Sequence, residues 1–249
     1  MRKPVMAGNW KMYKTAAETS SFFEKFRGMV ERSEHCEIVI CPPYPNLPAA
    51  VAAAQGTRIG IGAQNLFWAK EGAYTGEVSG PMIRTLGCSH AIIGHSERRQ
   101  YFGETNETVL KKTMAALEAG LTPIVCVGET LEHREGGQTE VVILDHCQNG
   151  TSGLTADQFA RILIAYEPVW AIGTGKTATP EIAADAHRVI RGFARSAFGQ
   201  QAASSLRILY GGSVKPDNVK GLMAQPEIDG ALVGGASLDP ISFASIVNF

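Results

Sequence analysis

The sequence predicts a single (β/α)8 barrel that spans residues 1–249 as one domain. Eight short apolar runs recur along the chain, each rich in Ile, Val or Leu, as in strands that are buried on both faces. Segments with helical spacing lie between these runs, and this alternation favours a parallel sheet with right-handed crossovers. Eight strand–helix units also fit the length of a closed barrel, which is roughly 250 residues.

An open, doubly wound sheet is the alternative. It would normally carry a GxGxxG turn at the first helix, and a second domain would bring a break in composition. The sequence has neither feature, so the closed barrel is favoured.

The predicted strands follow one another at short intervals. In order they are PVMAGNW (4–10), EIVICPP (37–43), RIGIGAQN (58–65), HAIIGHS (90–96), PIVCVGE (123–129), ILIAYE (162–167), RILYGGS (207–213) and GALVGG (230–235).

Three of the intervening helices have clear signals. Residues 106–120 are expected to end on Gly120 as the C′ residue, and residues 179–199 to begin with Thr179 as N-cap and Pro180 in the first turn. Residues 15–33 are expected to bury one face. That face consists of Phe22, Phe23, Phe26, Met29 and Val30.

Composition excludes several classes of function. A net charge of −1 gives no electrostatic reason to bind nucleic acid or an anionic membrane. The start is not a signal peptide, and no apolar run approaches the ~20 residues that span a bilayer, so a cytoplasmic protein is expected. The five cysteines are odd in number and form no CxxC, which favours free thiols, and the histidines show no metal-ligand spacing. A metal site is therefore not expected.

The candidate site lies at the carboxyl ends of the strands, where barrels of this kind place their chemistry. A lysine, an imidazole and a carboxylate meet there with polar amides and bare glycine turns, and the last two turns follow strands 7 and 8, where such barrels frequently bind phosphate. The residues are Asn9, Lys11, Gln64, Asn65, His95, Glu167, Gly211, Gly212, Ser213, Gly234 and Gly235.

Two further segments stand out. GTGKT at 173–177 ends like a nucleotide-binding P-loop, but that motif needs glycine at the position of Trp170, so an ATPase or kinase is rejected. The 65–79 loop is long for a strand–helix connection and carries Phe67, Trp68 and Tyr74. Either it folds back on the barrel or it meets a partner, and its apolar side chains favour a partner.

Six stretches together resemble the triosephosphate isomerase family. They occur in the family's order and span nearly the whole chain. They are AGNWKM (7–12), GHSERR (94–99), CVGET (126–130), AYEPVWAIGTGKTAT (165–179), YGGSV (210–214) and GALVGGASL (230–238).

The resemblance implies interconversion of dihydroxyacetone phosphate and glyceraldehyde 3-phosphate through an enediolate, without a cofactor. It makes Glu167 the general base and His95 a neutral electrophile, held neutral by a helix N-terminus. It implies positive charge from Lys11, orientation of substrate by Asn9, and support from Ser96 and Glu97. The phosphate would be held by Gly173, Ser213, Gly234 and Gly235.

The resemblance also implies a closing lid and a homodimer. The dimer would form through the 65–79 loop, with Thr75 reaching the neighbouring site, although Tyr13 stands where members often carry a smaller polar residue. The lid would consist of Pro168, Val169, Trp170, Ala171, Ile172, Gly173, Thr174, Gly175, Lys176 and Thr177.

Two other functions stay open at this point. One is another phosphate-binding barrel enzyme, such as an epimerase or an aldolase. An aldolase would need a Schiff-base lysine, for which Lys11 is the rim candidate. A non-catalytic dimeric scaffold would have no need of Glu167, His95 and Lys11 together.

Overall fold

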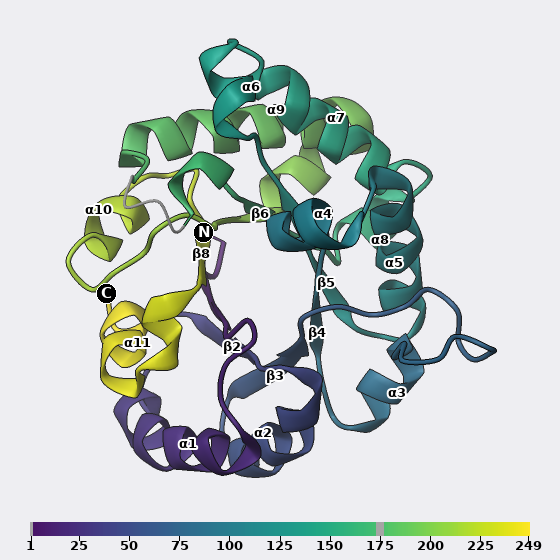
Figure 1. Ribbon diagram of the computed structural model, residues 1–249. Helices are drawn as coiled ribbons and strands as arrows, with labels where there is room; N and C mark the ends of the chain where they lie inside the picture. The colour runs from purple at the N-terminus through teal and green to yellow at the C-terminus, as the bar shows by residue number, and fades with distance from the viewer. Residues whose placement is uncertain (1, 173–176) are drawn as a thin grey trace.

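Eight parallel strands form a closed barrel in the computed structural model, which describes residues 2–172 and 177–249 (Figure 1). Each strand pairs with the next, and β8 pairs with β1, so the predicted barrel is confirmed. The strands are β1 (Val5–Asn9), β2 (Glu37–Cys41), β3 (Ile59–Ala63), β4 (His90–Ile93), β5 (Thr122–Val127), β6 (Leu163–Tyr166), β7 (Arg207–Tyr210) and β8 (Gly230–Val233).

Helices surround the barrel as an outer ring (Figure 1). They are α1 (Ala16–Val30), α2 (Leu47–Ala54), α3 (Gly80–Thr85), α4 (Ser96–Phe102), α5 (Asn106–Glu118), α6 (Leu131–Glu135), α7 (Thr139–Thr151), α8 (Ala156–Phe159), α9 (Pro180–Ser205), α10 (Val219–Met223) and α11 (Pro240–Val247). Three 3₁₀ turns join them: η1 (Tyr44–Asn46), η2 (Val169–Ala171) and η3 (Gly235–Leu238).

The buried face of α1 is narrower than predicted. Phe22, Phe23, Phe26 and Val30 are buried as expected, but Met29 is 42% exposed. The prediction was wrong for Met29 because it lies at the margin of the apolar stripe, and helical spacing does not fix how far neighbouring elements cover that margin.

The local helix signals are confirmed at α5 and at the start of α9. Gly120 follows the α5 C-cap with φ of 75°, and the Thr179 side chain accepts from the N–H of Ile182. The predicted limit of this helix at Gly199 coincides with a break inside α9. Helical structure resumes after Gly199, which breaks the helix with φ of 90°, and ends at Ser205.

Apolar side chains fill both sides of the sheet. One cluster lies between the strands and the helices, and a second fills the barrel interior. The barrel closes where β8 meets β1. A Cβ on Gly230 would lie 2.0 Å from the Val5 carbonyl oxygen, so this approach requires glycine.

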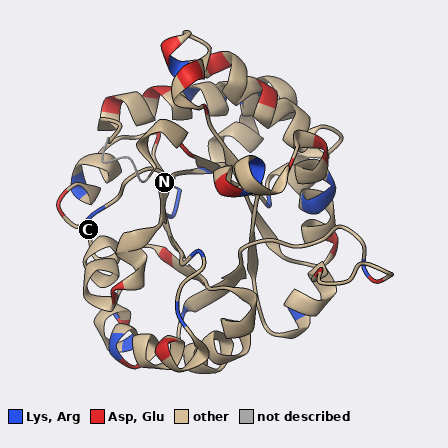
Figure 2. Cartoon of the chain, viewed as in Figure 1, with Lys and Arg blue, Asp and Glu red and all other residues tan. Residues whose placement is uncertain are grey.

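Charged residues lie mainly on the outer helices and connections, with both signs interspersed (Figure 2). Among the described residues, no helix is both long enough and apolar enough to cross a membrane.

Candidate active site

One cavity of about 380 Å³ opens at the carboxyl ends of the strands. It brings together most of the residues predicted for the site, from both ends of the sequence. Those in its lining are Asn9, Lys11, His95, Glu167, Gly211, Gly212, Ser213, Gly234 and Gly235.

Glu167 is a fully bonded carboxylate directly after β6. Its side chain is 2% exposed. Oε1 lies 2.8 Å from His95 Nε2, and Oε2 accepts from the Ser96 backbone N–H at 2.9 Å. Burial raises the pKa of Glu167, but the attraction of His95 and these hydrogen bonds outweigh it, so the net pKa is lowered. Glu167 is therefore a weak base while it keeps these contacts.

His95 is oriented by the backbone of α4, for which it is the N-cap. Its Nδ1 accepts from the N–H of Glu97 at 3.2 Å, so Nε2 carries the proton and faces Glu167. Burial lowers the pKa of His95, but the Glu167 carboxylate more than offsets this and the net pKa is raised. The Glu97 N–H at the start of α4 thus favours the neutral ring, as predicted from the helix N-terminus, whereas the nearby Glu167 carboxylate favours the protonated one. Neutrality would be favoured once Glu167 moves away, because burial and the Glu97 N–H would then dominate.

Lys11 occupies a turn that three polar groups shape. Its φ is 52°, in the left-handed region, and its N–H donates to Asn9 Oδ1 at 3.0 Å. Gln64 Nε2 donates to the Lys11 carbonyl at 2.9 Å, and Lys11 Nζ lies 2.5 Å from Glu97 Oε1. Glu97 therefore contacts both Lys11 and the His95 ring, whose Nδ1 is 3.6 Å from Glu97 Oε2.

Gln64 and Asn65 do not reach the cavity, contrary to prediction. Gln64 braces the Lys11 turn, and Asn65 Oδ1 accepts from Lys112 Nζ at 2.8 Å. Both side chains form hydrogen bonds that stabilise the fold.

The glycine turn after β7 lies against Glu167, and the turn after β8 lies near Lys11. A Cβ on Gly211 would stand 2.9 Å from Glu167 Cγ, so the close approach of this turn depends on its glycine. After β8, η3 begins at Gly235, and the first N–H groups of such a turn have no partner within it. They are suited to an anion.

The predicted lid is only partly described, since Gly173, Thr174, Gly175 and Lys176 lie outside the described residues. Pro168 and η2 follow Glu167 directly, Ala171 and Ile172 line the cavity, and Thr177 precedes α9.

Glu129 anchors η2, and the sequence analysis missed this role. It is fully buried, and Oε1 accepts from Trp170 Nε1 at 2.8 Å and from the Tyr166 hydroxyl at 3.1 Å. The Val169 N–H also donates to the Glu129 carbonyl. The available signal was its place in CVGET, an acid at the end of a buried strand.

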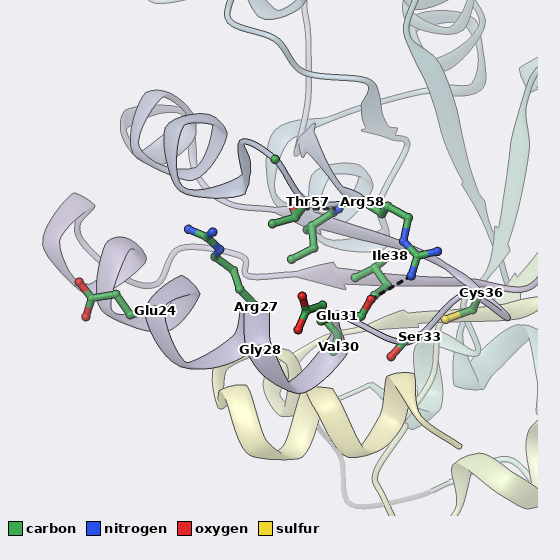
Figure 3. A pocket seen from close by; sticks show the side chains of 12 residues that line it. Glu24, Arg27, Gly28, Val30, Glu31, Ser33, Cys36, Ile38, Thr57 and Arg58 are labelled. Atoms are coloured by element: carbon green, nitrogen blue, oxygen red, sulfur yellow. Dashed lines mark hydrogen bonds between the residues drawn. The ribbon is translucent and has the colours of Figure 1, made fainter.

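A second cavity, of about 500 Å³, lies away from these residues, beside α1 and the turn before β3 (Figure 3). Arg27 and Arg58 lie toward opposite ends of it, and Glu24 and Glu31 balance their charge. It contains none of the predicted site residues. The candidate site is therefore identified by the residues that line a cavity and not by the volume of the cavity. Among the described residues, no group of three or more His, Cys, Asp or Glu side chains could hold a metal ion.

Residues 4–249 match the family model described as Triosephosphate isomerase. The chain belongs to the triosephosphate isomerase family. A triosephosphate isomerase from Solibacter usitatus is 74% identical over the full length of both chains, and one from Citrifermentans bemidjiense is 58% identical over all of this chain and 99% of that protein. The crystal structure of triosephosphate isomerase from Bartonella henselae superposes with a TM-score of 0.89 at 39% identity, and covers 99% of this chain and 98% of that one.

Membership of the triosephosphate isomerase family confirms the resemblance and identifies the chain as an isomerase. It leaves the role of each residue to the geometry of the cavity.

Proposed function

We propose that this cavity is where the chain interconverts dihydroxyacetone phosphate and glyceraldehyde 3-phosphate. The observation that carries the proposal is the 2.8 Å contact between Glu167 and His95, in a cavity that also holds Lys11 and two glycine turns. A carboxylate and an imidazole beside an anion site are what proton transfer next to a carbonyl requires.

Glu167 takes a proton from C1 of the ketone. The C–H electron pair forms the C1–C2 double bond, and the carbonyl pair moves to oxygen. His95 Nε2–H donates to that oxygen, and Lys11 adds positive charge where the negative charge develops. Return of the proton to C2, with transfer between the two oxygens through His95, gives the aldehyde. No metal or organic cofactor takes part.

The base is activated by separation from its present partners. When Glu167 leaves His95 and Ser96, the contacts that lower its pKa are lost while its burial remains. Movement of the 168–177 lid, which begins at the residue after Glu167, supplies this displacement. Ser96 and Glu97 support the site by holding Glu167, His95 and Lys11.

The phosphate binds at the glycine turns. Ser213, Gly234 and Gly235 offer backbone N–H groups there, Gly173 adds another from the lid, and Asn9 helps to orient the substrate. Because the phosphate is remote from the reacting carbons, its binding energy is available to move the lid.

We also propose a cytoplasmic homodimer formed through the 65–79 loop, with Thr75 in the partner's site. Residues 71–77 are all exposed, and the loop extends beyond the ring of helices (Figure 1). Exposed apolar side chains lie on the β1–α1 connection, on the 65–79 loop and at the end of α4. They are Met12, Tyr13, Tyr74, Tyr101 and Phe102. Light scattering tests the dimer, and a monomer at micromolar concentration would contradict it.

A coupled assay of isomerisation tests the activity, and Glu167→Asp tests the base. The shorter side chain withdraws the carboxylate by about 1 Å, so a loss of roughly a hundredfold is expected with the fold intact. Near-normal turnover would remove Glu167 from this role. Borohydride trapping with substrate separates the aldolase alternative, because only a Schiff base on Lys11 would be trapped.

A further inference from the structure

Among the residues that the structure describes, two lysines and no arginine line the active-site cavity. The first, Lys11, already has its ammonium group 2.5 Å from the Glu97 carboxylate. The second, Lys215, is exposed, and within residues 2–172 and 177–249 its ammonium group makes no ion pair or hydrogen bond. Its charge is therefore available to a ligand.

Asn218 fixes the backbone that carries Lys215. Its Oδ1 accepts from the Lys215 N–H at 2.9 Å, and its Nδ2 donates to the Ser213 carbonyl at 3.0 Å. One side chain thus bridges both sides of the connection between β7 and α10. The bridge keeps Lys215 beside Ser213, at the end of the cavity where the glycine turns offer N–H groups.

The charge balance of the cavity makes Lys215 the positive charge that is left to attract a phosphate. Glu97 neutralises Lys11, and Glu167 adds a negative charge in the lining. Without Lys215, a dianionic phosphate would approach a cavity that carries no net positive charge. A cation at the rim attracts such a ligand over a distance comparable with the Debye length, about 10 Å at moderate salt.

We propose that Lys215 is a capture residue for the phosphate dianion, which speeds productive binding and leaves the chemical step to Glu167 and His95. The inference rests on the proposed function, since it assumes that a triose phosphate is the substrate. It assigns specificity for a doubly charged phosphate to a side chain outside the reacting centre.

The test compares Lys215→Gln and Lys215→Glu with the control Lys220→Gln, an exposed lysine on α10 outside the cavity lining. At low ionic strength we expect Lys215→Gln to lower kcat/KM by about three- to tenfold, and Lys215→Glu to lower it further. The inhibition constant of inorganic phosphate should rise in parallel, and kcat should stay within about twofold. Added salt should shrink the differences, because it screens an exposed charge.

Two results would overturn the inference. One is a Lys215→Gln enzyme that matches Lys220→Gln in kcat/KM and in its salt dependence. The other is a fall in kcat with unchanged inhibition by phosphate, which would make Lys215 part of the chemical step or of the fold. Wild-type protein that isomerises no triose phosphate would instead defeat the proposed function, so the two failures are distinguishable.

Discussion

Two clusters of ionisable residues in this molecule have similar compositions and opposite characters. The rim cluster at the cavity consists of His95, Lys11, Glu97 and Glu167. The lower cluster, where β7 and β8 begin, consists of His187, Arg191, Glu227 and Asp229. Each has one imidazole and two carboxylates. Lys11 is the cation of the rim cluster, and Arg191 is the central cation of the lower one, where Arg2 also bonds Asp229.

The two clusters differ in how many hydrogen bonds their central cation makes and in whether they face a cavity. Arg191 donates to the side chains of Glu227 and Asp229 and to the carbonyls of Ala203, Leu206 and Glu227. Lys11 has a single acidic partner, and its cluster opens into a cavity. The lower cluster is held by many contacts to one guanidinium, whereas the rim cluster faces a cavity and can exchange its contacts for a substrate.

The comparison first predicts a large loss of stability from Arg191→Met. Removing one partner of a buried ion pair typically costs about 3–5 kcal/mol of unfolding free energy. Asp229 would stay buried with Arg2 as its remaining cation, and Glu227 would lose its ion pair. Denaturant unfolding measures the loss, with Arg195→Met, at an exposed position of the same helix, as control. Activity per folded molecule should be unchanged, and a strongly reduced value would mean that the lower cluster also serves the reaction.

Lys11→Met should reverse this pattern. We expect kcat/KM to fall by as much as about a thousandfold, since a preorganised charge at the developing oxyanion is lost. The Lys11 and Glu97 side chains are 26% and 36% exposed, so their ion pair is worth only about 0–1 kcal/mol of stability. The same two assays measure both effects. A Lys11→Met protein with intact activity and reduced stability would show that Lys11, like Arg191, stabilises the fold and does not serve the reaction.

The sequence predicted what depends on local signals and missed what depends on distant contacts. Thr179–Pro180 and Gly120 mark helix ends through their own backbone preferences, so these predictions held. Asn65 was expected in the cavity but meets Lys112, and Glu129 was overlooked although it bonds Trp170. Neither contact is visible in local spacing, because each joins segments about forty residues apart that only the closed barrel brings together.

The two histidines sharpen the comparison further. His95→Gln removes the ring that faces the reacting oxygen, so kcat should fall by about a hundredfold while KM changes only a few-fold. Steady-state kinetics on a folded variant, verified by circular dichroism, measures the split. If KM alone rises, His95 binds substrate and does not stabilise the developing charge.

We expect His187 to affect how the unfolding free energy depends on pH and to leave the turnover number unchanged. It is fully buried, and its Nδ1–H donates to the Glu227 carbonyl at 3.0 Å. Nε2 has no partner among the described residues, so a proton there would be buried without an acceptor. Burial, with Arg191 nearby, lowers the pKa of His187 to about 3 against the opposing effect of the Glu227 carbonyl, whereas the unfolded chain has an ordinary value of about 6.5.

The sign of the effect follows from these two values. Above about pH 6.5 neither state binds the proton, so the contribution of His187 to stability is complete there. Between that pH and about 3, the unfolded chain binds the proton and the native protein does not, which lowers stability by about 1.4 kcal/mol for each pH unit. We therefore expect the unfolding free energy of His187→Gln to fall less steeply than that of the wild type between pH 6 and pH 4.5. The two slopes against pH should differ by the uptake of about one proton on unfolding. His35→Gln, at an exposed histidine, is the matched control and should keep the wild-type slope. Equal slopes for all three proteins would mean that His187 is protonated in the native state, and the lower cluster would then be as adaptable as the rim.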